Sequence, residues 1–384
     1  MPIKPRSNWQ QQADEFGFKF HTMYGQAYWD ESAYYQFTLK QIEQDIETPT
    51  EELHQMCLHL VDNVVKDEAL LKKFCIPEHK WQLVADSWQQ QQPSLYSRLD
   101  FCYSGSGPAK LLENNADTPT SVYETGFWQW LWLEQQVDAG ALPRSSDQFN
   151  SLQERLIARF AEIWPNQDAS ILHFACCKDT EEDRGTVQYL ADCARAAGIS
   201  SEFVFIEDIG VDAQGQLTDK QNRVLQALFK LYPWEFMFQE NYHKHINNQL
   251  LWLEPSWKSV LSNKAMLPML WQMFPKHPNL LPAFFESDMP SVSSSQSWVK
   301  KPIFSREGAN ISILDNSSTL TSSSGPYGEE GFIFQQTKLL PKFEKNYTLI
   351  GSWLVNGTAA GISIREDSSP ITQDMSRFLP HIIL

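Results

Sequence analysis

Hydrophobic residues in the first quarter of the chain recur at helical spacing. The following apolar positions share one predicted helix face: Leu53, Cys57, Leu60, Val61 and Val64. Thr50 precedes this run and is followed by two acidic residues, a pattern that predicts the N-terminal cap of the helix. Aromatic residues are dense between positions 8 and 40, which favours a buried core over a ligand platform. We therefore predict a helical N-terminal region over residues 1–95.

A β-hairpin is predicted near position 100. The segment Ser104-Gly-Ser-Gly-Pro108 supplies its turn, because glycines admit positive φ angles and proline ends a strand ladder. Side chains alternate between the two faces of a strand, so Arg98 and Asp100 share one side of the first strand. By the same rule, Glu113 and Asn115 share one side of the returning strand. If these sides coincide, one face of the hairpin is strongly polar.

A strand–helix–strand unit is predicted in the middle of the chain. Residues 171–177 form a short apolar run, residues 184–197 have the spacing of a helix, and residues 203–206 form a second apolar run. The apolar residues that follow predict a further helix through Leu225 and Leu228 that ends at Tyr232-Pro233. These elements indicate a parallel sheet with a crossover helix.

The last third of the chain is predicted to be rich in strands. A helix over residues 265–274 comes first, and a strand–loop–strand unit over residues 298–313 contains Gly308 in its loop. Three further strands are predicted, at residues 331–336, 347–355 and 359–364. The fold class that follows is mixed α/β (α+β).

Composition narrows the possible partners and the compartment. The 384 residues carry 31 Lys and Arg against 47 Asp and Glu, a net charge of −16, which would repel a nucleic-acid backbone. The chain lacks the run of about 18 apolar residues that a membrane span requires, and its start lacks the apolar core of a signal peptide. The 6 cysteines form no C-x-x-C pair, which favours free thiols in a reducing compartment. We expect a soluble, cytoplasmic protein that binds neither nucleic acid nor membranes.

The polar face of the hairpin suits a magnesium site. Asp100, Glu113 and Asn115 would supply two carboxylates and an amide oxygen, and Mg²⁺ prefers such ligands. Arg98 would then contact a phosphate or an oxyanion rather than the metal. Spacing alone leaves open the alternative of a solvated hairpin face with an Arg–Asp pair.

The hairpin also resembles a motif of a known family. The segments Arg98-Leu-Asp-Phe101 and Leu112-Glu-Asn-Asn-Ala-Asp117 are similar to the metal-binding hairpin of the synthetase domain of glutathionylspermidine synthetase, an ATP-grasp ligase of acid and amine. Further similar segments follow the family's order along nearly the whole chain: residues 27–35, 51–57, 212–217, 254–257, 263–268, 301–308 and 335–336. A G-x-x-x-x-G-K-[ST] phosphate loop is absent from the sequence, which disfavours a P-loop nucleotidase.

The resemblance implies an architecture. It is an ATP-grasp-like fold in a circularly permuted arrangement, because the metal ligands precede the ATP-binding lysines along the chain. It also implies an α-helical N-terminal region and an inserted βαβ substrate domain. Four ranges follow: 1–95, the helical region; 96–168, the metal-binding hairpin with its following helices; 169–248, the βαβ substrate-binding, preATP-grasp-like domain; and 249–384, the ATP-binding part with the lysines and the glycine loop.

The resemblance further implies roles for individual residues. Asp100, Glu113 and Asn115 would hold Mg²⁺, and Arg98 and Arg365 would act in catalysis on the transferring phosphoryl group. The residues that would contact ATP are Arg98, Leu99, Asp100, Lys264, Lys301, Glu307, Gly308, Gln335, Gln336, Thr337 and Lys338. Within this set the lysines would contact the phosphates and the adenine side, the glycine loop would cover the phosphates, and residues 335–338 would receive the adenine.

The substrate side departs from the family pattern. Glu181 and Glu182 match an acidic segment that would receive an amine. Ser121 stands where the family places a cysteine near its thiol substrate, and Thr118 precedes it in the same segment. Leu231 replaces a family threonine. The resemblance therefore implies an intact ATP half and an altered acid-substrate half.

The expected activity is an ATP-dependent carboxylate–amine ligase that forms an amide through an acyl phosphate, with ATP and Mg²⁺ as cofactors. The acid would be a small peptide or amino acid, and the amine a polyamine or another cation attracted by an acidic protein. The alternative is a Mg-ATP-binding module or ATPase of ATP-grasp fold that has no ligase activity and acts through a partner. The helical N-terminus would be available as a homodimer face.

Overall fold

The structure is a computed structural model that describes the 384-residue chain apart from residues 167–168, 290–296, 307, 316–317 and 373–375. Its central feature is a six-stranded antiparallel sheet in the order β20-β19-β18-β4-β5, with β17 paired to β18. The strands are β4 (Tyr96–Cys102), β5 (Lys110–Asn115), β17 (Lys342–Phe343), β18 (Asn346–Val355), β19 (Thr358–Asp367) and β20 (Arg377–Leu379). The predicted hairpin is confirmed, and its first strand pairs with a strand from the end of the chain.

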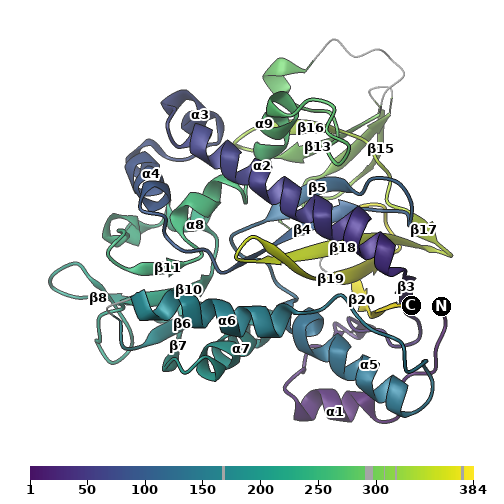
Figure 1. The fold of residues 1–384 in the computed structure, drawn as a ribbon. Coiled ribbons are helices and arrows are strands. Elements are labelled where there is room, and N and C mark those ends of the chain that lie inside the picture. The colour runs from purple at the N-terminus through teal and green to yellow at the C-terminus, as the bar shows by residue number, and fades with distance from the viewer. Residues whose placement is uncertain (167–168, 290–296, 307, 316–317, 373–375) are drawn as a thin grey trace.

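Helix α2 (Thr48–Val64) lies across the face of this sheet, over β18 and β19 (Figure 1). The apolar positions predicted from its spacing are all buried. The prediction that Thr50 caps the helix is wrong, because a π-helical segment, Gln41–Glu47, runs directly into α2. Thr50 instead donates from its hydroxyl to the carbonyl of Ile46 at 2.6 Å. The π-type turn accommodates Pro49, which has no N–H to donate, so the proline does not end the helix.

A second, parallel sheet has the order β11-β10-β6-β7 and lies below the central sheet in Figure 1. Its strands are β6 (Leu172–Cys176), β7 (Ser201–Phe205), β10 (Ala227–Leu231) and β11 (Leu251–Leu253), and α7 (Glu181–Ala196) connects β6 to β7. The predicted strand–helix–strand unit is therefore confirmed. The helix predicted through Leu225 and Leu228 is wrong, because residues 227–231 form β10 with both of its faces buried. Such a strand reads as a continuous apolar run, which periodicity cannot distinguish from a buried helix.

A third sheet is antiparallel and five-stranded, in the order β12-β16-β13-β14-β15. Its strands are β12 (Ala283–Phe285), β13 (Trp298–Pro302), β14 (Ser312–Asp315), β15 (Ser318–Ser322) and β16 (Phe332–Gln336). Helix α9 (Met266–Met273) packs on β12 and β16. The strands and the helix predicted for this part of the chain are confirmed, and the sheet lies at the top of Figure 1.

Smaller elements complete the fold. They are α1 (Trp9–Glu15), β1 (Thr22–Met23), β2 (Gln26–Ala27), β3 (Tyr35–Phe37), α3 (Glu68–Lys73), α4 (Trp81–Gln89), α5 (Gln129–Asp138), α6 (Leu152–Ile163), β8 (Gly210–Val211), β9 (Leu217–Thr218), α8 (Trp234–Met237) and β21 (His381–Ile383). β3 pairs in parallel with β21, so the two ends of the chain lie close together (Figure 1). Each helix among the described residues is too short or too polar to cross a lipid bilayer.

The predicted aromatic core near the N-terminus is present in part. Phe18, Phe20 and Trp29 are buried with residues of α5, α6 and α7 in one hydrophobic cluster. Phe16 and Tyr24 from the same segment are exposed. A separate cluster joins α2 and α9 to the apolar side of the β4–β5 hairpin, where Phe101 and Leu111 lie. The hairpin therefore has an apolar side toward α2, and its polar side faces the other way.

Candidate active site

The polar sides of the two hairpin strands coincide. Arg98 lies opposite Asn115 in the β4–β5 ladder, and Asp100 lies opposite Glu113. Arg98 donates from Nε to Asp100 Oδ1 at 2.6 Å and from Nη2 to Oδ2 at 3.1 Å, and Asn115 donates to the same Oδ2 at 3.1 Å. The side chains of Arg98 and Asp100 are 6% and 2% exposed, so the alternative of a solvated Arg–Asp pair is wrong. A buried cation and two carboxylates therefore lie together on this face.

A glycine on the neighbouring strand makes room for the arginine. Gly351 of β18 pairs with Asp100, and a Cβ built on it would lie 2.6 Å from Arg98 Cδ and 2.6 Å from Ser363 Oγ. Both distances are far shorter than carbon contacts in packed proteins, which are about 3.5–4.0 Å. The Arg98 side chain consequently lies across the backbone of β18, and from there its Nη1 donates to the carbonyl of Thr120 at 3.0 Å.

Replacing Gly351 with alanine is expected to displace Arg98 and to slow ATP turnover. The added methyl group meets Arg98 and Ser363 together, so the guanidinium must leave Asp100 or the strands must separate. We expect a destabilisation of about 1–3 kcal/mol, typical of overpacking, with a larger proportional loss of turnover. Steady-state ATP hydrolysis and urea unfolding of the same preparation measure the two effects. Turnover equal to wild type would contradict the role of this glycine.

Two lysines from distant parts of the chain approach the hairpin. Lys264, two residues before α9, lies 3.1 Å from Glu113 Oε2 and donates to the carbonyl of Ser305 at 2.8 Å. Lys301 of β13 donates to the carbonyl of Leu112 at 2.9 Å and to Gln335 Oε1 at 2.8 Å. These contacts join the last β5 residues to the third sheet, so the carboxylate face is bordered by two cations from distant parts of the chain.

The lysines and the carboxylate adjust one another's proton affinity. Burial raises the pKa of Glu113, but the charges of Lys264, Lys301 and Arg98 outweigh it and hold the pKa at about 2, so this carboxylate is ionised at neutral pH. Burial lowers the pKa of Lys301 to about 8; the charge of Lys264 adds to this, and that of Glu113 opposes it. A ligand can therefore readily alter the charge of Lys301.

Two cavities meet at the hairpin. The larger one, of about 650 Å³, is lined by Arg98, Glu113, Asn115, Lys264 and Arg365, and it reaches the carboxyl ends of β6 and β10 at Cys177 and Leu231. The smaller one, of about 90 Å³, is lined by Asp100, Glu113, Lys301, Gly308 and residues 335–338. Glu113, Gly308 and Thr372 line both cavities. The polar hairpin face therefore lies at their junction.

The structure places most of the predicted ATP-site residues around the smaller cavity. Gln335, Gln336, Thr337 and Lys338 all line it. Gly308 has a φ of +68°, and a Cβ there would lie 2.3 Å from the carbonyl oxygen of Thr372, so only glycine fits this approach. Leu99 differs from the others, because its side chain lies in the hydrophobic core on the opposite face of β4. Glu307 lies outside the described residues.

The predicted substrate residues all line the larger cavity. They are Thr118, Ser121, Glu181 and Glu182, and Arg365 lies on the same wall with its guanidinium 5.5 Å from the ring of Phe378. Ser121 has a φ of +68°, an uncommon conformation for a residue with a side chain. The departures from the family pattern, Ser121 and Leu231, therefore both face this cavity.

Several residues of this region were missed from the sequence. Arg306 donates to Thr118 Oγ1 at 2.6 Å and to Glu235 Oε1 at 2.8 Å, although it lies inside a segment similar to the family. Tyr28 lines the larger cavity, and its hydroxyl contacts Glu124 and Glu182. No local pattern marks Glu124, which is buried inside a helical segment. Only the folded chain brings Glu124 against Tyr28, which lies at the cavity wall.

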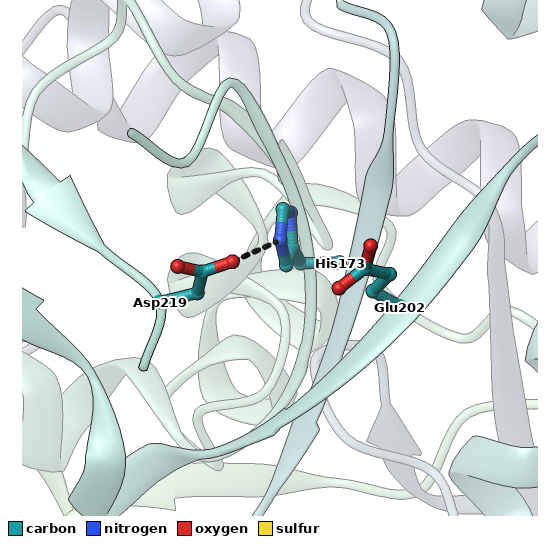
Figure 2. A group of neighbouring side chains, drawn as sticks. All are labelled: His173, Glu202 and Asp219. Carbon is teal, nitrogen blue, oxygen red and sulfur yellow. Dashed lines mark hydrogen bonds and ion pairs between the residues drawn. The ribbon is translucent and has the colours of Figure 1, made fainter. Parts of the chain in front are cut away.

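A separate polar cluster lies at the amino ends of β6 and β7. His173, Glu202 and Asp219 have possible metal-ligand atoms within 4.8 Å of one another, and Figure 2 shows the imidazole between the two carboxylates. Arg223 donates to Asp219 at 2.6 Å and to Glu202 at 2.6 Å, so a cation already neutralises both acids. Ligand sites in open parallel sheets form at the carboxyl ends of the strands, which is the opposite edge. We interpret this cluster as a structural ion pair.

Comparison with known proteins shows the family of the chain. The sequence model of the family described as glutathionylspermidine synthase preATP-grasp matches residues 1–384. A Haemophilus influenzae protein named "Putative acid–amine ligase" is 38% identical over 97% of this chain and 95% of its own length. The Escherichia coli bifunctional glutathionylspermidine synthetase/amidase is 30% identical over 92% of this chain, which spans 60% of that relative's length.

Structural comparison adds evidence on the fold. A glutathione synthetase-like effector from Globodera pallida superposes with a TM-score of 0.56 at 12% identity, covering 91% of this chain and 88% of its own. The family model and the curated relatives show an enzyme of the ATP-dependent acid–amine ligase class. Within that class, the chain belongs to the glutathionylspermidine synthase family.

Proposed function

We propose that the protein binds Mg-ATP between the central sheet and the third sheet and uses it to join a carboxylic acid to an amine through an acyl phosphate. The observation that carries this proposal is the position of the polar hairpin face. Glu113 lines a small cavity bordered by Lys301 and residues 335–338 and also a large cavity bordered by Arg98, Arg365 and Glu182. A nucleotide in the first would present its terminal phosphate to substrates in the second.

The donor set on the hairpin fits Mg²⁺. Asp100 and Glu113 would offer carboxylate oxygens from one face of the hairpin, and Asn115 would offer its amide oxygen once its amide group turns from the hydrogen bond to Asp100; Glu113 is ionised at neutral pH. These three residues would hold the ion, which when bound would neutralise charge on the phosphate oxygens. Lys264 and Lys301 would contact the phosphates, and residues 335–338 would border the adenine. The glycine loop at Gly308, with Glu307, would cover the phosphates.

Phosphoryl transfer depends mainly on positioning and on neutralising the charge that develops. Arg98 is fixed by Asp100 and by the carbonyl of Thr120, so its guanidinium is already oriented before a ligand arrives. Arg98 and Arg365 would stabilise the transferring group from the side of the large cavity. The acyl phosphate would form there, and the amine would displace phosphate from it.

The proposed substrate residues form two groups, one that suits a positively charged ligand group and one that suits a negatively charged one. Glu181 and Glu182 lie in the first turn of α7 and line the large cavity, where they would attract an ammonium group. Thr118 and Ser121 line another part of the wall, close to Arg98 and Arg306, cations that suit a carboxylate. We propose a small peptide or amino acid as the acid and a polyamine or related cation as the amine, with an acid site altered at Ser121 and Leu231.

The finer architecture is part of the proposal. An ATP-grasp-like arrangement is supported by the smaller cavity, which lies between the antiparallel central and third sheets. A circular permutation is supported by the pairing of β4, which precedes Lys264 and Lys301, with β18, which follows them. Residues 169–248, which contain β6, β7 and β10 of the parallel sheet, would be the inserted substrate domain, and the fourth strand, β11, follows this range. Residues 1–95, 96–168 and 249–384 would form the helical region, the hairpin part and the lysine-bearing part.

The function is tested by product formation. The purified chain is incubated with Mg-ATP and a metabolite extract, and mass spectrometry searches for products equal to an acid plus an amine minus water. ATP consumption that rises with such a product supports the ligase. ATP binding without stimulated turnover would instead identify a nucleotide-binding module that acts through a partner.

ATP binding is expected to take up protons above neutral pH. Lys301 has a pKa of about 8 in the free protein, so it is partly uncharged at pH 8–9. Nearby phosphate charges raise the pKa of a lysine, so the complex binds a proton that the free protein lacks. Affinity should therefore fall as pH rises through this range. Calorimetric titration of ATP in buffers with different ionisation enthalpies measures the uptake, and Lys301→Met should abolish it. Equal enthalpies in all buffers would contradict the assignment.

A further inference from the structure

Three oxygen-bearing side chains form a continuous line from the large cavity into the core. The hydroxyl of Tyr28 donates to Glu124 Oε1 at 2.6 Å and lies 3.1 Å from Glu182 Oε1. A phenol carries a single hydroxyl proton, so it can donate to only one of these carboxylates at a time. The phenol oxygen can also accept a hydrogen bond from a protonated carboxyl group, so a proton that arrives at one end of the line alters the proton available at the other.

The line has one end at the cavity and the other in the protein interior. Glu182 and Tyr28 line the large cavity together with Arg365. The ring of Tyr28 is held between Phe20 and Phe378, with centroids 5.7 and 5.0 Å away, so its hydroxyl has a fixed direction. Glu124 is 1% exposed, and its Oε2 has no hydrogen-bond partner among the described residues. A buried carboxylate oxygen without a partner is costly unless the group carries a proton part of the time.

The local backbone and charges favour proton exchange at Glu124. Glu124 opens a π-helical segment, Glu124–Trp128, a feature that is frequent at functional sites. Burial raises the pKa of Glu124 to about 7, while the hydrogen bond from Tyr28 and the charges of Arg98 and Arg365 oppose that rise. Burial and the charges of Glu124 and Glu182 raise the pKa of Tyr28, so the phenol keeps its proton between transfers. A group poised near neutral pH both accepts and returns a proton efficiently.

We propose that Glu182, Tyr28 and Glu124 form a proton-accepting relay for the amine that attacks the acyl phosphate; this rests on the ligase function proposed above. The amine arrives as an ammonium ion, which cannot attack until it loses a proton. That proton passes to Glu182 and on to the Tyr28 oxygen, while the phenol proton moves to Glu124. The nitrogen lone pair then forms the C–N bond and the C–O bond to phosphate breaks with its electron pair. The remaining surplus nitrogen proton leaves with the phosphate.

The experiment compares two nucleophiles on the same acyl phosphate. Hydroxylamine is uncharged at neutral pH and needs no base before it attacks, whereas an ammonium substrate does. With an acid–amine pair found in the product search, Tyr28→Phe and Glu124→Gln should lower amide formation by about 10²-fold. Trapping of the acyl phosphate by hydroxylamine should stay within a few-fold of wild type. Tyr123→Phe is the matched control, because its hydroxyl donates to the carbonyl of Phe16 and is not part of the line.

The pH dependence of amide formation gives a second measurement, which would not change if Glu124 had only a structural role. Wild-type amide formation should fall below a pH of about 7, where Glu124 becomes protonated, and this limb should disappear in Glu124→Gln. Equal losses of amide and hydroxamate, or an unchanged pH profile in both variants, would overturn the relay while leaving the ligase function intact.

A measurement without substrates separates the two proposals. Infrared difference spectra of the purified chain should contain a protonated-carboxyl band that titrates near neutral pH and is absent from Glu124→Gln. In Tyr28→Phe the band should titrate at higher pH, because the phenol hydrogen bond lowers the pKa of Glu124. Absence of a product from the search would overturn the ligase function. A carboxyl band that does not titrate would overturn the relay, whatever the outcome of that search.

Discussion

Replacing Glu113 with glutamine is expected to reduce ATP turnover by about 10²–10³-fold or more while the fold persists. The amide keeps the shape of the side chain but removes its charge from the junction of the two cavities. Lys264, which lies 3.1 Å from Glu113, would then leave an excess of positive charge at the proposed Mg²⁺ site. The side chain of Glu113 is 30% exposed, so water can solvate the groups that lose their partner and the stability loss should be small.

Magnesium dependence separates this effect from a general loss of activity. The Mg²⁺ concentration that gives half-maximal turnover should rise in Glu113→Gln, because one of two carboxylate ligands is lost. Glu286→Gln is the matched control, because it also removes a carboxylate that is paired to a lysine. Glu286 lies 3.2 Å from Lys300, a residue of the third sheet. Glu286 lines neither cavity, so this control should keep wild-type turnover. Wild-type turnover in Glu113→Gln would refute the metal assignment and the nucleotide site that depends on it.

The hairpin was predictable because its information is local. A glycine-containing turn and alternation over a few residues fix both the strands and the faces to which Arg98 and Glu113 belong. The strand–helix–strand unit was predictable for the same reason, since short apolar runs flank a periodic helix. The motifs around Lys264 and Lys301 depended on resemblance, because a single lysine carries no pattern of its own.

The residues that were missed depend on contacts between distant parts of the chain. Tyr28 and Glu124 are 96 positions apart, and nothing in either segment indicates that their side chains meet. Gly351 makes room for Arg98, which lies on β4, far earlier in the chain. Only the pairing register of β4 with β18 explains why a glycine is needed at this position. Lys230 was not recognised as a buried residue, because its segment was predicted to be a helix. The segment is instead the strand β10, which is buried on both faces and is apolar apart from this lysine.

Lys230 belongs to a buried ion pair whose loss is expected to have a large effect on the stability of the protein. Lys230 Nζ lies 2.5 Å from Asp117 Oδ1, and both side chains are fully buried. Asp117 also accepts from the backbone N–H of Trp234 at 2.9 Å, and Lys230 lies 4.5 Å from the Trp234 ring. The pair thus joins the segment after the β4–β5 hairpin to the parallel sheet. Burial raises the pKa of Asp117 and lowers that of Lys230, and each charge partly offsets the shift of the other.

Asp117→Asn is expected to lower the free energy of unfolding by about 3–5 kcal/mol, because the buried Lys230 must then either stay charged without a counter-charge or give up its proton in the folded chain. The double variant Asp117→Asn with Lys230→Met should recover much of this loss, since it buries no charge. The single variant should also become relatively more stable as pH rises from 7 to 9. Its unfolded state binds a proton that the folded state must give up, and stability rises with pH wherever the unfolded state binds more protons. Urea unfolding of the wild type and both variants at the two pH values measures these differences. A double variant less stable than the single one, or a single-variant deficit that does not depend on pH, would mean that Lys230 keeps its charge by finding water or another partner in the folded chain.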